Sequence, residues 1–253
     1  MLPLLNEIPR LADQLSQKRT ICLLFNFDEI EKSRIHTTVF LDQLIGLSRP
    51  PAVYAGIISQ KSPQTLPSEA LHHLINAGSN GFEIDGPNFS WKFPQLGMIY
   101  HQLEQLKTSL ALEIGPGWAE KHVSLNGTML TIADLPGDSF QQNRLMPLIR
   151  RELSDSFLQA VHLPEQIRIY PAKPWNKCMI VRKIVDLLPR LKGLHPLVLY
   201  FGADVSDEVA FREVNLYGYS ILLRENIGRK TEARYYLGSN RELNRILIWF
   251  NAL

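Results

Sequence analysis

Cysteine and long apolar runs are both scarce in this chain. Only two cysteines, Cys22 and Cys178, occur among 253 residues, so the sequence has no disulfide framework and no CxxC motif. Such sparse use of cysteine is typical of a reducing compartment, and we expect a cytoplasmic protein. The apolar runs are a few residues long, whereas a membrane-spanning helix needs about 20. The N-terminus also lacks the basic start and apolar stretch of a signal peptide.

Charge of one sign is scarce as well. The sequence has 27 basic and 25 acidic residues, a net charge of +2, and no single-sign run. We therefore expect neither a nucleic-acid partner nor an anionic membrane surface. His72 and His73 are adjacent rather than four residues apart, so they do not form the helical pair that commonly binds zinc.

The apolar residues that are present fall into strands and helices that alternate. Buried strands are predicted by short apolar runs over 20–25, 52–58, 196–201 and 219–223. Apolar residues at helical spacing predict helices over 5–15, 179–191, 209–214 and 243–250. Gly193 and Pro196 are expected to end the second of these helices. Alternating strands and helices predict an α/β fold with a doubly wound parallel sheet.

Polar residues follow three of the four predicted strands. They are Asn26 and Asp28 after the first strand, Ser59 after the second, and Asp204 and Asp207 after the third. Ligands of open α/β sheets bind at the carboxyl ends of the strands. These side chains are therefore the candidate site.

The middle of the chain has a different pattern. A helix is predicted over 95–106, extended structure over 111–133, and a helix over 145–157. Asn126-Gly127 between extended segments predicts a hairpin. We interpret 89–166 as an inserted α+β domain, with 1–88 and 167–253 forming one discontinuous core domain.

Four short segments, in order, resemble the motifs of a known superfamily. Leu24-Phe25-Asn26-Phe27-Asp28 resembles an apolar strand followed by DxDGT, and Ile57-Ile58-Ser59 resembles a strand that ends in Ser-Gly-Arg. Trp175-Asn176-Lys177-Cys178 resembles Trp-Asp-Lys-Gly. The segment from Phe201 to Phe211 resembles GDDxTDExAF. The chain thus resembles haloacid dehalogenase-type phosphatases of the trehalose-6-phosphate phosphatase group.

This resemblance implies a Rossmann-like core with a parallel sheet, an inserted α+β cap, and Mg²⁺-dependent phosphate ester hydrolysis. Asp28 matches the general acid/base. Ser59 and Lys177 match the phosphate-binding residues. The candidate metal ligands are Asp28, Asp204 and Asp207.

Two matched positions lack the carboxylate that the family uses. Asn26 occupies the position of the nucleophilic Asp, and an amide is neutral and a poor nucleophile. Ala203 occupies a metal-ligand position, and a methyl group ligates nothing. Glu29 and Ile30 replace Gly-Thr. These departures predict impaired catalysis and weak or lost Mg²⁺ binding.

Sugar recognition is altered too. Ala77 to Ile84 resembles the family's Gly-x-His-Gly-Ala-Glu segment, so Glu83 matches a sugar-hydroxyl acceptor, but Asn80 replaces the His. Arg168 replaces a sugar-contacting Glu if Arg168-Ile169-Tyr170-Pro171 corresponds to the family's Glu-Ile-Arg-Pro. The expected ligand class is therefore a sugar phosphate such as trehalose 6-phosphate, with a specificity that these replacements alter.

Three functions stay open from the sequence. The first is a pseudophosphatase that binds a sugar phosphate or a trehalose-pathway protein. The second is an active phosphatase with a rearranged site. The third is a non-catalytic structural subunit. Some matched residues also have ordinary structural explanations: Lys177 as a solvated residue in the first turn of its helix, and Asp207 and Glu208 as a helix cap and dipole partner.

Overall fold

The chain divides into two compact units. The computed structural model describes residues 1–16, 19–33, 35–65, 68–135, 141–172, 175–223 and 230–252. The first unit comprises Met1–Ser59, Pro63–Trp91 and Trp175–Leu253. The second unit comprises Gln60–Ser62 and Lys92–Pro174, where the sequence analysis placed an inserted domain at 89–166.

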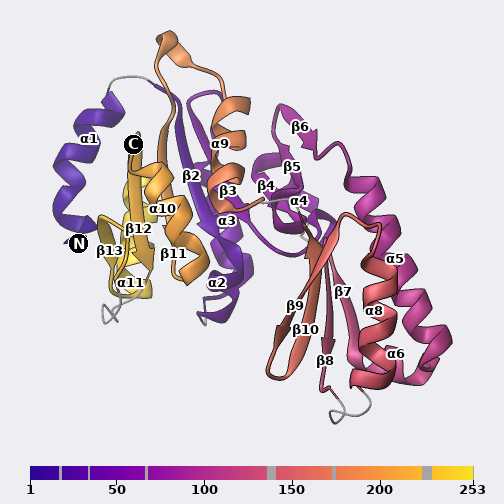
Figure 1. Ribbon diagram of the computed structural model, residues 1–253. Coiled ribbons are helices and arrows are strands. Elements are labelled where there is room, and N and C mark those ends of the chain that lie inside the picture. Colours follow the sequence, from indigo (N-terminus) through magenta and orange to yellow (C-terminus); the bar gives the residue numbers. More distant parts are fainter. Residues whose placement is uncertain are drawn as a thin grey trace. The chain divides into compact units, whose positions relative to one another are not determined.

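The first unit is built on a nine-stranded sheet in the order β1-β13-β12-β11-β2-β3-β4-β5-β6 (Figure 1). Neighbours pair in parallel from β1 to β4, whereas β4 and β5 pair antiparallel. The strands are β1 (Leu2–Pro3), β2 (Ile21–Asn26), β3 (Val53–Ile58), β4 (Ile75–Gly78), β5 (Glu83–Gly86), β6 (Phe89–Lys92), β11 (Leu197–Gly202), β12 (Gly218–Leu223) and β13 (Tyr235–Leu237). The predicted doubly wound parallel sheet is confirmed.

Helices cover both faces of this sheet. One face packs against α1 (Ile8–Ser16), α2 (Phe27–Lys32), α3 (Thr37–Leu47), α4 (Ser68–His73) and α11 (Asn240–Asn251). The other face packs against α9 (Lys177–Leu187) and α10 (Glu208–Val214). In β2, Leu23 and Phe25 belong to the first core, whereas Cys22 and Leu24 belong to the second. Burial of both faces explains why the strand sequences are apolar without alternation.

The second unit contains a four-stranded antiparallel sheet in the order β7-β8-β10-β9, and its described residues also form the helices α5, α6 and α8 (Figure 1). Gly127 has a φ of 58° at the tight turn between β7 and β8, which confirms the predicted hairpin. The elements are β7 (Val123–Asn126), β8 (Met129–Ala133), β9 (Leu158–Leu163), β10 (Gln166–Pro171), α5 (Leu96–Glu113), α6 (Pro116–His122) and α8 (Met146–Leu153).

Three sequence predictions of local structure were wrong. One is the helix expected over 145–157, because α8 ends at Leu153. Extended structure was expected from residue 111, but α5 continues to Glu113 and α6 occupies Pro116–His122. Pro116 at the first helical position favours a new helix start rather than a strand. The helix expected over 179–191 is α9, which ends at Leu187. Pro189 disfavours helical backbone at Leu188 and so ends the helix before Gly193 is reached.

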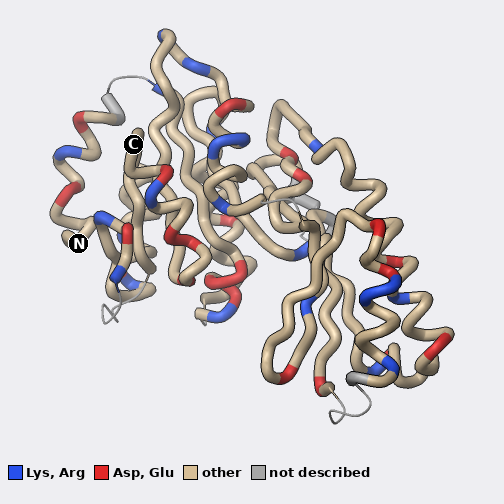
Figure 2. The backbone as a smooth tube through the Cα atoms, viewed as in Figure 1, with Lys and Arg blue, Asp and Glu red and all other residues tan. Residues whose placement is uncertain are grey.

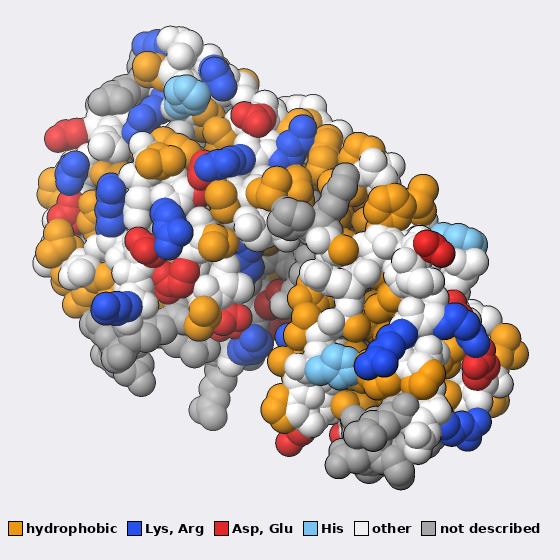
Figure 3. Space-filling model, in the orientation of Figure 1, with side chains coloured by type: hydrophobic (Ala, Val, Ile, Leu, Met, Phe, Trp, Pro, Cys, Tyr) orange, Lys and Arg blue, Asp and Glu red, His pale blue; other side chains and the backbone are white. Residues whose placement is uncertain are grey.

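Charged residues are distributed along the whole chain. Basic and acidic positions are interspersed in both units (Figure 2). On the face drawn in Figure 3, basic, acidic and apolar side chains also alternate over short distances. Within the described residues, no helix combines the length and the apolar character that crossing a bilayer requires.

Candidate functional site

The candidate site lies in the first unit, where the order of the strands reverses. The chain runs from β2 to β3 on one side of β2, and from β11 to β12 on the other side. The carboxyl ends of β2 and β11 therefore flank the crevice at which open α/β sheets bind ligands. Asn26 is the last residue of β2, and Gly202 is the last residue of β11.

Asp207 is the centre of the site. Its side chain has no exposed surface. The carboxylate accepts hydrogen bonds from the Tyr200 hydroxyl at 2.7 Å and from the backbone amides of Ala203 and Asp204, each at 2.8 Å. The Lys177 ammonium lies 2.6 Å from Oδ1 of Asp207. A buried charge is tolerated only when it is paired and hydrogen-bonded, and Asp207 meets both conditions.

The Asn26 amide completes this arrangement. Its Nδ2 atom donates to both oxygens of Asp207, at 3.2 Å to Oδ1 and 2.9 Å to Oδ2. Because a carboxylate only accepts hydrogen bonds, this contact fixes the orientation of the amide, with the nitrogen toward Asp207. Among the described residues, none hydrogen-bonds to Oδ1 of Asn26, which is buried. The position therefore presents an N–H donor to its neighbour, where an aspartate would present a second negative charge.

These contacts shift two pKa values in opposite directions. Burial alone raises the pKa of Asp207, but the charge and hydrogen bond of Lys177, with hydrogen bonds from Asn26 and Asp204, outweigh it and lower that pKa. Burial raises the pKa of Tyr200 well above its usual value, and the nearby Asp207 charge adds to this effect. Asp207 is therefore ionised and Tyr200 protonated at neutral pH.

A second pair sits at the start of α2. The Ser59 hydroxyl, just after β3, donates to Oδ1 of Asp28 at 2.8 Å. Helix α2 begins at Phe27, directly after β2. Glu29 and Ile30 are thus helical: the Ile30 side chain is buried in the core, and the Glu29 carboxylate lies 2.7 Å from the Lys32 ammonium.

The remaining sequence-predicted residues have local roles. The Asp204 side chain accepts from Val205 N and, with Asp207, forms a reciprocal cap of the helical turn Val205–Asp207. The Glu83 carboxylate is buried in β5 and accepts from the Ser79 hydroxyl at 2.9 Å. Arg168 is an exposed residue of β10 in the second unit.

Comparison with known proteins places this site in context. No protein-family model matches the chain. The trehalose-phosphate phosphatases of Mycobacterium ulcerans and Mycobacterium marinum are 23% and 26% identical to it over 159 and 153 residues. Each match covers 59% of this chain and 38% of the relative, so the similarity spans well under half of these longer proteins.

Solved structures match over a larger share of the chain. The C-terminal domain of Candida albicans trehalose-6-phosphate phosphatase superimposes with a TM-score of 0.61 at 16% identity, covering 97% of this chain and 96% of that domain. The C-terminal domain of the Candida albicans trehalose synthase regulatory protein gives 0.56 at 14% identity, covering 96% and 97%. The chain has the haloacid dehalogenase fold and resembles trehalose-phosphate phosphatases in sequence.

In the first unit, the structure brings five motif positions into one hydrogen-bonded group around Asp207: Asn26, Lys177, Ala203, Asp204 and Asp207 itself. Ser59 and Asp28 also form a hydrogen-bonded pair. For Glu83, the contact named above lies within its own β4–β5 segment.

Two residues of the site were missed by the sequence analysis. Tyr200 donates to Asp207 from inside β11, where an aromatic residue looked like ordinary core. Gly202 provides space, since a Cβ atom there would lie 2.5 Å from Cγ of Asp207. The glycine before an Ala-Asp pair at a strand end was the only available signal.

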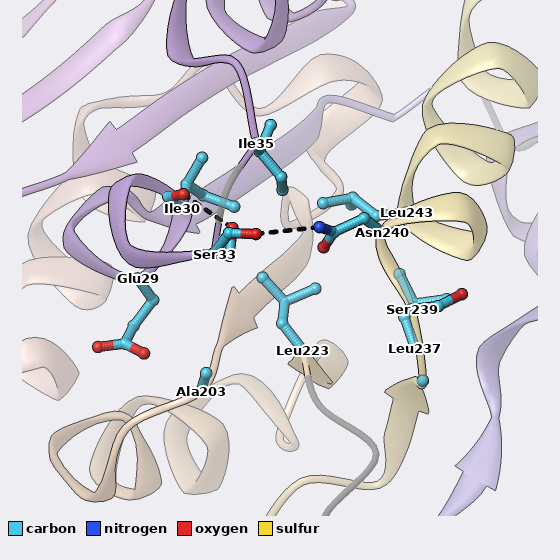
Figure 4. A pocket seen from close by; sticks show the side chains of 11 residues that line it. Glu29, Ile30, Ser33, Ile35, Ala203, Leu223, Leu237, Ser239, Asn240 and Leu243 are labelled. Carbon is cyan, nitrogen blue, oxygen red and sulfur yellow. Dashed lines mark hydrogen bonds between the residues drawn. The ribbon is translucent and has the colours of Figure 1, made fainter.

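The donor atoms available for Mg²⁺ are few. Both oxygens of Asp207 already accept hydrogen bonds, Oδ1 of Asp28 accepts from Ser59, and Ala203 has no ligand atom. Within the described part of the chain, no cluster of three or more His, Cys, Asp or Glu side chains is arranged to hold a metal ion. Mg²⁺ prefers octahedral oxygen coordination that includes carboxylates. Here position 26 offers only a neutral amide oxygen and position 203 offers no ligand (Figure 4), so this donor set fits Mg²⁺ poorly.

Proposed function

We propose that the chain is a catalytically impaired pseudophosphatase whose retained role is binding. The observation that carries this proposal is the hydrogen bond from the Asn26 amide to both oxygens of Asp207. A neutral amide, oriented by a buried carboxylate, occupies the position that the nucleophilic Asp holds in the resembling phosphatases.

Loss of the metal follows from the same contacts. In the motif pattern, a divalent cation would neutralise carboxylates at positions 26, 203 and 207. Here Lys177 and the Asn26 amide offset the charge of Asp207, and positions 26 and 203 carry no charge. We infer that the site is stable without Mg²⁺ and has little affinity for it.

The ligand of the retained role is either a sugar phosphate, such as trehalose 6-phosphate, or a protein of the trehalose pathway. Lys177 is held by Asp207 and the Ser206 hydroxyl, and Ser59 is held by Asp28. A phosphate must displace these contacts beside three carboxylates, those of Asp28, Asp204 and Asp207. This balance of charge favours the protein partner. A structural neighbour that is itself a regulatory protein domain supports that preference.

Phosphate release from trehalose 6-phosphate with Mg²⁺ tests the proposal. We expect no turnover above background for the native chain and measurable turnover for the Asn26→Asp, Ala203→Asp double variant. Loss of a nucleophile alone reduces rates by roughly 10⁴-fold or more. Turnover by the native chain that Asp28→Ala or Asp204→Ala abolishes would instead support an active phosphatase with a rearranged site.

A further inference from the structure

Strand β9 forms one edge of the sheet in the second unit (Figure 1). An edge strand has a row of backbone N–H and C=O groups without a neighbouring strand, and proteins commonly protect such edges with charged residues, proline, bulges or short strands. The other three sheet edges have such features. β1 has two residues and includes Pro3, β6 ends with Lys92, and β7 has four residues.

The β9 edge is longer, regular and uncharged. Its six residues, Leu-Gln-Ala-Val-His-Leu, include no Lys, Arg, Asp, Glu or Pro. They pair with β10 one for one from Leu158 to Leu163, so no bulge interrupts the strand. The side chains of Gln159, Val161 and His162 are exposed. The strand therefore has none of the sequence features that discourage edge-to-edge pairing.

The hydrogen bonds between β9 and β10 show which backbone groups of β9 point outward. The backbone amide of Ala172, just after β10, donates to the carbonyl of Phe157, just before β9. In an antiparallel pair, such hydrogen-bonded positions recur at every second residue. The odd-numbered residues of β9 therefore direct their N–H and C=O groups toward β10, whereas Ala160 and His162 direct theirs away from the sheet. None of the described residues hydrogen-bonds to these outward groups.

A second copy of β9 supplies matching partners for these groups. With two β9 strands antiparallel about a two-fold axis at Ala160, the two Ala160 residues exchange both of their hydrogen bonds. Leu158 of one copy then lies opposite His162 of the other, and Gln159 lies opposite Val161. Because neither strand has a Lys, Arg, Asp or Glu residue, no like charges meet across the pair.

We propose that the chain forms a symmetric dimer in which β9 pairs antiparallel with β9 of a second copy, so that the two four-stranded sheets become one continuous sheet. A strand pair of this length buries less surface than a stable interface needs, so we expect a concentration-dependent dimer with a dissociation constant on the order of 0.1 mM. The proposal is independent of whether the chain hydrolyses phosphate esters.

Sedimentation velocity and amide hydrogen exchange, measured over one concentration series, test this dimer. We expect the weight-average sedimentation coefficient to rise with concentration. Hydrogen exchange at the amides of Ala160 and His162 should slow by about fivefold or more once most chains are dimeric. Exchange at Gln159 and Val161 should be slow at every concentration, because these amides already bond to β10.

Two edge variants and two matched controls locate the contact. Ala160→Pro removes an outward N–H without removing a bond to β10, and Val161→Lys adds a charge to the edge strand. Each should weaken dimerisation at least about tenfold. Ala160→Ser keeps the N–H, and Leu112→Lys adds the same charge in α5 at a side chain that is 79% exposed. Both controls should dimerise within about twofold of the native chain.

Three results would overturn the proposal. The first is a native chain that stays monomeric throughout the series. The second is a dimer in which the amides of Ala160 and His162 exchange as fast as in the monomer, because its interface then lies elsewhere. The third is undiminished dimerisation of either edge variant in its folded form.

Discussion

At the scale of single residues, the main feature of the site is the contact between the Asn26 amide and the Asp207 carboxylate. A buried carboxylate needs donors on every side, and the amide supplies one to each oxygen. An aspartate at position 26 would place two carboxylates about 3 Å apart, where both cannot ionise without a cation between them. The sequence predicts an amide at the position of the family's nucleophile, and in the structure this amide donates to Asp207.

The Asn26→Asp variant should therefore be less stable without metal. We expect a loss of about 3 kcal/mol in the free energy of unfolding, because an unpaired buried charge is introduced. Millimolar Mg²⁺ should recover part of this loss, whereas it should not stabilise the native chain. Urea denaturation with chelator and with Mg²⁺ measures both effects. Asn244→Asp, which adds the same charge on the exposed side of α11, is the control, and equal losses in the two variants would contradict the account.

Asp207 should also control stability in acid. The pKa of Asp207 is lowered in the folded chain. Its contribution to the free energy of unfolding is therefore present above the unfolded pKa of 3.8, and is lost as the pH falls through the lower pKa of the folded chain. At neutral pH, Asp207→Asn should cost about 3–5 kcal/mol, since Lys177 loses its buried partner.

The difference in the free energy of unfolding between the native chain and the Asp207→Asn variant should accordingly shrink below about pH 4. Chemical denaturation at several pH values measures it. Asp204→Asn, at an exposed residue where Asn also caps well, should cost under about 1 kcal/mol. If the free energies of unfolding of the native chain and of Asp207→Asn differ by the same amount at every pH, Asp207 is not the ionised centre of this group.

Strand β11 and the turn after it set the site at the scale of secondary-structure elements. The strand carries Tyr200, Gly202 and the backbone amide of Ala203 to one carboxylate. Because the turn Val205–Asp207 folds back, the side chain of Asp207 packs over Gly202. The glycine is required there by close approach rather than by an unusual φ.

Gly202→Ala should displace Asp207 from its donors. The added Cβ would lie 2.5 Å from Cγ and 2.8 Å from Cβ of Asp207, so we expect a loss of about 1–3 kcal/mol. In α5, a Cβ at Gly97 would meet nothing within 4 Å, so Gly97→Ala should be neutral or stabilising by up to about 1 kcal/mol. Denaturant midpoints compare the two, and equal midpoints would refute the packing argument.

The sequence predicted the elements that are apolar on both faces or strongly periodic. β2, β3, β11 and β12 were found because both of their faces are buried. β13 and β4 were missed, since they are short and β4 contains Asn76 and Gly78. The site positions were visible as motifs, but the bond from Asn26 to Asp207 joins residues far apart in the chain, and no local pattern encodes it.

At the scale of the whole molecule, the fold matches solved structures more fully than the sequence matches the motif pattern. The structural match covers nearly the whole chain at identities near 15%, whereas the carboxylates at positions 26 and 203 are absent. Tyr200, which donates to Asp207, belongs to the second apolar core of the first unit, so this contact also contributes to stability. The contact between Lys177 and Asp207 therefore has a structural role whether or not the chain is catalytic.

Capture of a covalent phosphoryl group on the protein tests the central claim most directly. The chain is mixed with trehalose 6-phosphate and Mg²⁺, quenched in acid, and analysed by intact-protein mass spectrometry, beside the Asn26→Asp, Ala203→Asp double variant. Our account predicts no phosphorylated native chain and a phosphorylated fraction of the double variant at residue 26. A phosphoryl group on the native chain, at Asp28 or any other residue, would contradict it.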